Sequence, residues 1–369
     1  MSKKQHTDTA QNILAMLAIG LTLFGLLMIA SAGAIYSETR FGSQWFFVIR
    51  QAIGAGLGFA VLLVVRQIDY HVWQRLAVPA MMVATALLII LLVPGVSTEV
   101  YGAKRWLEVG PVSFQPSELM KIALIFYLAA LFAGKTRAAL RDVYEGLVPF
   151  LAVVGGVSFL IVSQPDVGTL GVMIIVAGVM FFVAGARLTH LAALALGGVV
   201  ALGALIKAAP YRMERFMTFL DPSRDPQGAG YQVIQGLIAV GSGSVWGRGF
   251  GHSLQKFNYL PEPVGDSIFA VIAEELGFVG TTLLLLAFAT FAYYGYRTAL
   301  RAPDMFGRLV ATGITTWIVV QAFFNIAATV ALMPLTGIPL PFISYGSTAL
   351  VITLSAVGVL LNIAARSRA

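Results

Sequence analysis

The chain contains no cysteine among its 369 residues, which excludes disulfide bonds, thiolate metal sites and a cysteine nucleophile. Histidine is almost as scarce: only four are present, and no two of them have the spacing of a zinc site. Charge is scarce as well, because Asp, Glu, Lys and Arg make up only 11% of the residues, whereas a soluble protein has about a quarter. With 58% hydrophobic residues, the composition indicates an integral membrane protein.

The net charge of +7 is compatible with a nucleic-acid partner, but the placement of the basic residues argues against one. They gather in short segments between apolar runs, such as Lys135, Arg137 and Arg141, or Arg366 and Arg368. Such clustering is typical of cytoplasmic loops under the positive-inside rule. We therefore expect no nucleic-acid binding, and we place these segments in the cytoplasm.

Ten stretches are long and apolar enough to cross a bilayer as helices. They lie near 13–36, 46–65, 76–94, 116–133, 147–163, 169–186, 188–206, 267–296, 309–333 and 347–364. The sequence therefore predicts an all-α polytopic membrane protein that forms one membrane domain over residues 1–369. Both termini are expected in the cytoplasm, with 1–12 as the N-terminal tail. The small-residue run at 30–34 resembles a signal-peptidase site, but the apolar stretch before it favours an uncleaved anchor.

Two segments on the outer side of this topology are long. The first covers 95–115, and the second, 207–266, is the large extracytoplasmic loop between the seventh and eighth spans. Within the second, Tyr231–Val240 has an apolar face and is predicted to form a helix along the membrane surface. The glycines that follow match no phosphate-binding loop, because no Gly-Lys-Ser/Thr comes after them. We interpret them as tight turns, and the alternative is that their backbone amides face a ligand.

Polar side chains occur where the predicted spans reach the outer side, and charge at membrane depth marks a function or a buried pair. Glu118 and Lys121 are three residues apart at the start of the fourth span, so they can pair on one helical face. Gln164 and Asp166 flank a proline in SQPDVGT, and Asp266 opens the eighth span. The proline-rich segment MPLTGIPLPFISYGS precedes the tenth. Such features are tolerated only around a water-accessible cavity, which we expect to open to the outside.

Most of these residues also have a structural interpretation. Glu274 and Glu275 are expected to stabilise the fold by bonding to Lys121, Asn325 or a helix end. Trp106 is equally compatible with an interfacial anchor and with a platform for a substrate. Asp266 can cap the helix that follows it, but the rigid PEPVG approach and the predicted cavity favour a function.

Five segments resemble the SEDS family, whose members include FtsW, RodA and SpoVE. They are GAKRWLEVGPVSFQPSELMK, QPDVGT, FLDPSRDPQGAGYQVIQGLIAVGSG, QKFNYLPEPVGDSIFAVIAEELGFVG and GIPLPFISYGST, and they occur in the family's order over residues about 100 to 350. QKFNYLPEP and DPSRDPQGAGYQ are more similar to the FtsW/SpoVE division branch than to the RodA elongation branch. One departure is Val-Gly-Asp before Ser267, where many relatives have His-Thr-Asp or a similar triplet.

The resemblance implies a ten-helix fold and processive peptidoglycan glycosyltransfer from lipid II at the outer face of the cytoplasmic membrane. It also implies a class B penicillin-binding protein as partner, together with other membrane proteins of the division machinery. Asp266 falls on the family's essential aspartate, the proposed catalytic base. The alternatives are a lipid II flippase, a RodA-type elongation polymerase and a scaffold without activity.

The implied reaction needs a base and a group that neutralises the departing lipid pyrophosphate. Asp266 is the catalytic candidate, and a divalent cation, Mg²⁺ or Mn²⁺, is an alternative to Lys and Arg for the pyrophosphate. The sequence assigns no ligands to such a metal. The substrate-binding candidates are Arg105, Lys121, Glu118, Gln115, Trp106, Gln164, Asp166, Arg248 and Lys256, with Arg212 and Arg215 as weaker ones. Glu274, Glu275 and Asn325 are predicted to be structural polar residues.

Overall fold

The computed structural model describes residues 2–93, 98–100, 103–109, 112–257 and 259–367. In this part of the chain, ten helices are long and apolar enough to cross a membrane, which confirms the predicted polytopic fold. The helices of these spans are α1 (Ser2–Phe41), α2 (Phe46–Gln67), α3 (His71–Ile90), α4 (Pro116–Ala133), α6 (Val148–Val162), α7 (Val167–Ala184), α8 (Leu188–Lys207), α11 (Ile268–Arg301), α12 (Met305–Thr329) and α13 (Ser347–Arg366).

The helices differ from the predicted spans mainly at their ends, where several of them extend into polar residues beyond the apolar stretch. Helix α1 begins at Ser2, so the tail predicted at 1–12 is largely helical. Helix α3 begins at His71 rather than near 76. A π-helical turn, Val143–Leu147, leads into α6. Helix α12 ends at Thr329 rather than near 333, because the prolines that follow exclude a regular helix.

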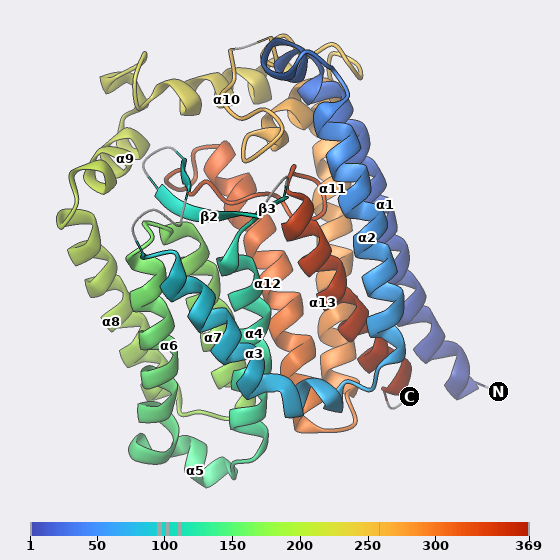
Figure 1. The fold of residues 1–369 in the computed structure, drawn as a ribbon, viewed down its shortest axis with the longest axis vertical. Helices are drawn as coiled ribbons and strands as arrows, with labels where there is room; N and C mark the ends of the chain where they lie inside the picture. Colours follow the sequence, from blue (N-terminus) through green and yellow to red (C-terminus); the bar gives the residue numbers. More distant parts are fainter. Residues whose placement is uncertain (1, 94–97, 101–102, 110–111, 258, 368–369) are drawn as a thin grey trace.

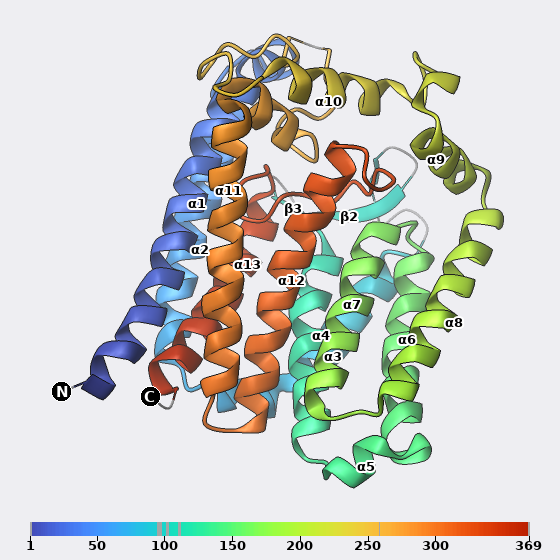
Figure 2. The same ribbon diagram turned by 180° about the vertical axis from the view of Figure 1, so that it is seen from behind.

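Helix α12 is the centre of the bundle, where it packs against α4, α7, α11 and α13 (Figures 1 and 2). Helices α1, α2, α11 and α13 pack together on one side of it, and α3, α4, α6 and α7 on the other. Helices α2 and α13 approach closely: a Cβ on Gly54 would lie 2.7 Å from that of Ser347, the kind of small-residue contact that membrane helices favour. In α12 and α13, 72% of the most apolar 18-residue stretch is buried within the protein, against 6% in α8. Helix α8 is therefore a peripheral helix.

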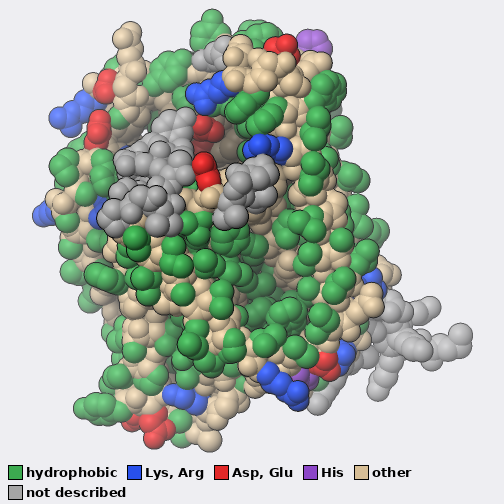
Figure 3. Space-filling view, viewed as in Figure 1, with side chains coloured by type: hydrophobic (Ala, Val, Ile, Leu, Met, Phe, Trp, Pro, Cys, Tyr) green, Lys and Arg blue, Asp and Glu red, His purple; other side chains and the backbone are tan. Residues whose placement is uncertain are grey.

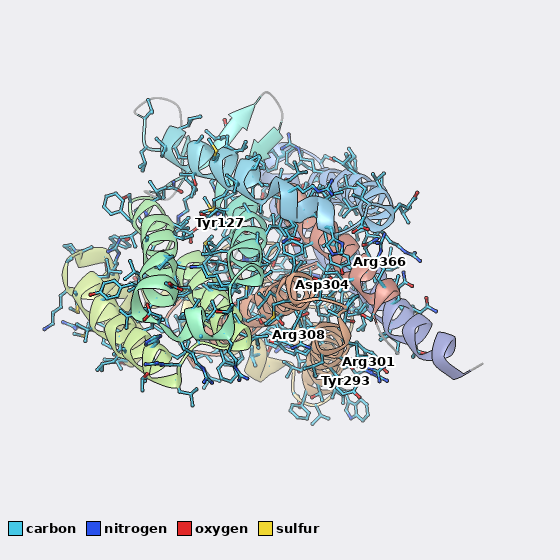
Figure 4. The ribbon with its side chains drawn as sticks, turned by 90° about the horizontal axis from the view of Figure 1, so that it is seen from below. Tyr127, Tyr293, Arg301, Asp304, Arg308 and Arg366 are labelled. Atoms are coloured by element: carbon cyan, nitrogen blue, oxygen red, sulfur yellow. The ribbon has the colours of Figure 1, made fainter. Side chains whose placement is uncertain are left out.

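The surface has the charge distribution of a membrane-spanning protein. Hydrophobic side chains cover the middle of the molecule and charged side chains gather toward its two ends (Figure 3). Both termini lie at one end, as an even number of crossings requires (Figure 1). Figure 4, a view from this end, labels Arg301, Asp304, Arg308 and Arg366. Here Arg366 pairs with Asp69, and hydrogen bonds from His71 lower the pKa of Asp69 to about 2.

The opposite end carries the β-sheet and the helices of the segment between α8 and α11 (Figure 1). The long loop expected at 95–115 contains a three-stranded antiparallel sheet of β1 (Thr98–Val100), β2 (Ala103–Val109) and β3 (Val112–Phe114), in that order, which the sequence did not predict. Helix α10 (Tyr231–Ser242) confirms the helix predicted at Tyr231–Val240. Helix α9 (Pro210–Leu220) and the 3-10 turn Pro222–Arg224 were not predicted. These elements cover this end of the bundle (Figure 1).

Helix α11 is broken at Gly277, where φ is 65° and ψ is −164°. The chain before the helix satisfies the backbone groups around the break: the Phe278 N–H donates to Ser244 O (2.9 Å), and the Arg248 N–H donates to Glu274 O (2.9 Å). A Cβ on Gly277 would lie 2.2 Å from the Gly247 nitrogen, so the contact requires glycine. The loop at 243–249 is thus bound to α11 on both sides of the break.

Candidate active site

Asp266 lies at the end of a tight turn that leads into α11. The Gly265 and Ser267 N–H groups both donate to Glu262 O, at 3.0 and 3.3 Å. Ser267 occupies the N-cap position, and no side chain caps the helix. The Asp266 carboxylate therefore does not act as the helix cap, which the sequence had left open.

An open pocket of about 330 Å³ contains Asp266. Its walls come from four segments that are distant in sequence: α10, the turn before α11, the outer end of α12, and residues 335–338. The lining residues are Gln232, Val233, Gly236, Asp266, Ser267, Asn325, Ala328, Thr329, Leu335, Thr336, Gly337 and Ile338. A hollow with acidic side chains is visible near this end of the molecule in Figure 3. The pocket agrees with the predicted polar cavity at the end opposite the termini.

The Asp266 carboxylate is held loosely. Its Oδ2 accepts a 3.4 Å hydrogen bond from Gln232 Nε2, and its Oδ1 is shielded from solvent without a hydrogen-bond partner. Burial and the negative charge of Glu262 raise the pKa of Asp266 to about 6, against the lowering effect of the Gln232 bond. A carboxylate with a free oxygen and a pKa in this range is suited to accept a proton.

A second pocket of about 290 Å³ adjoins the first, since Val233 and Leu335 line both. Arg215 and Thr218 of α9 line its far side. The positive charge of Arg215 acts on Asp266 and counteracts part of the rise in its pKa. Arg215, a weaker candidate in the sequence, is thus the pocket-lining cation next to Asp266. Arg212 instead donates to Leu205 O (3.2 Å) at the end of α8.

The pair predicted between Glu118 and Lys121 is confirmed at 2.8 Å, with both side chains about 2% exposed. Lys121 Nζ also donates to Gln321 Oε1 (2.7 Å) and lies 4.8 Å from the centre of the Trp317 ring. Lys121 therefore links α4 to α12, one helical turn from Asn325. The Glu118 Oε2 atom is buried without a partner.

The residues around the SQPDVGT turn form a separate cluster. Arg105 donates to the carbonyl oxygens of Gln164 (3.2 Å) and Pro165, and its Nη1 lies 4.0 Å from Asp166 Oδ1. Asp166 caps α7 through the Thr169 N–H (3.2 Å), and Gln115 donates to its Oδ2 (3.4 Å). The structure thus brings these predicted residues together, away from the lining of the Asp266 pocket.

Two neighbours of this cluster make other contacts. Trp106 follows Arg105 on β2 and is half-buried. Gln164 donates through Nε2 to Leu88 O (2.9 Å), which joins the turn to α3. Binding of substrate by these residues stays a prediction.

The glutamates of α11 bind residues of the outer loop. Glu274 accepts from Ser253 Oγ (2.5 Å) and lies 3.6 Å from Arg248 Nε. Glu275 pairs with Lys256 Nζ at 2.9 Å. The predicted partners Lys121 and Asn325 are wrong, because the break in α11 brings the loop at 243–256 back onto the helix.

These contacts also involve two residues predicted to bind substrate, a role that stays a prediction. The Lys256 side chain is 6% exposed and points to Glu275, and it donates to Ser31 Oγ (3.0 Å) as well. Arg248 faces Glu274 with 39% of its side chain exposed. Neither residue lines the Asp266 pocket. Both are placed to hold the outer loop against α11.

The sequence did not predict Gln232, Ser267 or Thr336 as site residues. Signals were present in the sequence: Gln232 ends the family-like segment DPSRDPQGAGYQ, Ser267 follows Asp266, and Thr336 stands in the proline-rich segment expected to be irregular. Asn325, predicted to be structural, both lines the pocket and donates to the Asp266 carbonyl oxygen (2.8 Å). In the described part of the chain, no three His, Cys, Asp or Glu side chains gather as a metal site would require. A divalent cation bound here would need oxygens from its ligand to complete its coordination.

The fold and the pocket define a multi-pass membrane protein with a carboxylate in a pocket at the end opposite its termini. The chain belongs to the SEDS family: a family model described as "Cell cycle protein", which represents FtsW, RodA and SpoVE, matches residues 11–369.

The curated relatives match over nearly their full length. Stage V sporulation protein E of Bacillus subtilis (strain 168) is 43% identical over 100% of this chain and 99% of its own. A probable peptidoglycan glycosyltransferase FtsW of Geobacter sp. (strain M18) is 38% identical over 96% and 97%. A solved structure described as "Structural coordination of polymerization and crosslinking by a peptidoglycan synthase complex" has a TM-score of 0.77 and 29% identity, over 95% of this chain and 96% of that one.

Proposed function

We propose that this chain is a peptidoglycan glycosyltransferase that polymerises lipid II into glycan strands at the outer face of the cytoplasmic membrane. Membership of the SEDS family supports this activity, as do relatives named as probable peptidoglycan glycosyltransferases. The observation that carries the proposal is the Asp266 carboxylate, which faces an open pocket with one oxygen unpartnered. The proposed orientation puts both termini in the cytoplasm and the pocket outside.

The proposed reaction joins two lipid-linked sugars. The 4-hydroxyl oxygen of one sugar bonds to the anomeric carbon of the other, and the bond from that carbon to the lipid pyrophosphate breaks. Asp266 accepts the hydroxyl proton, and the pyrophosphate leaves with the bonding electron pair. A positioned general base of this kind contributes about 10² to 10⁴ in rate. Arg215, in the adjoining pocket, is placed to stabilise the charge on the leaving group.

The division branch of the family is the favoured assignment within this proposal. The relatives at 43% and 38% identity are named SpoVE and FtsW, and the loop segments noted above are similar to the same branch. For the partner we propose a single-pass class B penicillin-binding protein. A structural relative described as belonging to a peptidoglycan synthase complex, which coordinates polymerization and crosslinking, supports that choice.

The test is polymerisation of purified lipid II by the detergent-solubilised protein, with and without the partner, and with Mg²⁺ or Mn²⁺. Wild type is expected to make long strands, and Asp266→Asn none. Asp225→Asn is the matched control, because Asp225 is an exposed outer-loop residue whose Oδ1 accepts from the Gly228 N–H (3.1 Å). Its activity should be normal.

The same experiment separates the alternatives. A fully active Asp266→Asn would refute the general base. Absence of strands from wild type under every condition, together with lipid II translocation in liposomes, would favour the flippase.

A further inference from the structure

Among the residues that the structure describes, three buried oxygens in the Asp266 pocket have no hydrogen-bond partner. They are Asp266 Oδ1, Asn325 Oδ1 and Thr336 Oγ1, and all three residues line the same pocket. Buried polar atoms in folded proteins are nearly always hydrogen-bonded, and leaving one unpaired is costly. Three in one pocket therefore indicate a ligand that supplies the missing partners.

The orientation of Asn325 is fixed by its other atom. Its Nδ2 donates to the carbonyl oxygens of Asp266 (2.8 Å) and Ile338 (2.9 Å). Exchanging the amide oxygen and nitrogen would set oxygen against both carbonyls, so Oδ1 must remain the free atom. With the residue only 2% exposed, this oxygen is a rigid hydrogen-bond acceptor.

The ligand must therefore offer donors. Ionised Asp266 and Asn325 Oδ1 can only accept, and Thr336 is the single member of the set that can also donate. A pyrophosphate carries negative charge and no donors at neutral pH, so this set repels it. Sugar hydroxyl and N-acetyl N–H groups are donors of the required kind. The cation Arg215 lies in the adjoining pocket. The first pocket is therefore suited to a sugar and the adjoining pocket to a phosphate.

We infer that Asn325 and Thr336 are positioning residues for the attacking sugar. Their Oδ1 and Oγ1 atoms accept hydrogen bonds from the sugar, which orients its attacking hydroxyl toward Asp266 Oδ1. This inference rests on the proposed function and assigns the pocket to the sugar that attacks. Asn325 thus combines two roles, because its amide nitrogen fixes the Asp266 backbone while its oxygen receives the sugar.

Thr336→Val tests the inference, because it removes one hydroxyl and nearly conserves the side-chain volume. The matched control is Thr312→Val. Thr312 is buried in the same helix as Asn325 but does not line the pocket, and its hydroxyl donates to Arg308 O (2.8 Å) within α12. Initial polymerisation rates are measured over a range of lipid II concentrations, and melting temperatures are measured for each variant.

We expect Thr336→Val to lower kcat/KM about tenfold, the effect of one lost hydrogen bond to the sugar. Thr312→Val should retain wild-type kinetics, and Thr336→Ser, which keeps the hydroxyl, should retain most of the wild-type kcat/KM. The melting temperature of Thr336→Val should stay near that of wild type.

Two results would overturn the inference while leaving the proposed function intact. Equal kinetics of Thr336→Val and Thr312→Val would show that the free hydroxyl binds nothing in the reaction. A defect of Thr336→Val that additional Mg²⁺ or Mn²⁺ repairs would show that these oxygens bind a cation. If wild type makes no strands with any partner or cation, the proposed function is wrong and the inference fails with it.

Discussion

Asp266→Asn should stabilise the fold while it abolishes activity. Burial raises the pKa of Asp266 from 3.8 to about 6, so folding favours the protonated carboxyl. The stability that this group contributes is fully present below about pH 3.8 and is lost as the pH rises through about 6. Because a change of one in pKa corresponds to roughly 1.4 kcal/mol, this rise limits the effect of Asp266 ionisation on the free energy of unfolding to about 3 kcal/mol. An amide is uncharged at every pH and avoids this cost.

The measurement is thermal unfolding of wild type and Asp266→Asn in the same detergent, at about pH 8 and at about pH 4. At the higher pH the variant should melt a few degrees above wild type. At the lower pH the difference should nearly vanish, because wild type is then largely protonated too. Asp225→Asn should show no gain at either pH, since the Asp225 carboxylate accepts backbone N–H bonds at the surface.

A variant less stable than wild type at both pH values would refute this reasoning. It would mean that the ionised Asp266 is held by favourable partners. The free Oδ1 would then have a ligand within the protein, and its availability to a sugar hydroxyl would be in doubt.

Two further predictions concern the same site and its support. The polymerisation rate should rise about tenfold per pH unit below about 6 and level off above it, because Asp266 acts as a base only when ionised; a rate independent of pH through this range would contradict that role. Lys256→Met should destabilise the protein by about 3–5 kcal/mol in thermal unfolding, because it leaves Glu275 charged and buried. The double variant Lys256→Met/Glu275→Leu should recover most of that loss in stability. If it does not, the ion pair stabilises the fold through more than the neutralisation of each charge by the other.

Local patterns predicted the parts of the fold that depend on local physics. Ten apolar stretches became ten membrane-length helices, because the hydrocarbon core sets a minimum length that can be read from the sequence. Glu118 and Lys121 pair as expected because a spacing of three places both on one helical face. Asp266 could be singled out because its proline- and glycine-rich approach stands beside a membrane span.

Contacts between distant segments could not be predicted in this way. Glu274 and Glu275 bind Ser253 and Lys256 only because α11 breaks at Gly277, and a glycine within a hydrophobic run gives no sign of a positive φ. The Asp266 pocket joins α10, α12 and residues 335–338, whose proximity depends on the packing of the whole bundle. The two three-residue strands are too short for an alternation of apolar and polar residues to identify them.

The break at Gly277 has a consequence for the way the bilayer acts on the site. A continuous helix would carry any tilt imposed by a thinner or thicker membrane directly to Asp266 at its end. Here residues 244–249 are hydrogen-bonded to both sides of the break, and Lys256 joins Glu275 of the outer side to Ser31 of α1. A tilt of the lower part of α11 must therefore move this loop and α1 before it can move the carboxylate. Changes in membrane thickness should reach the substrate tails before they reach the reacting groups.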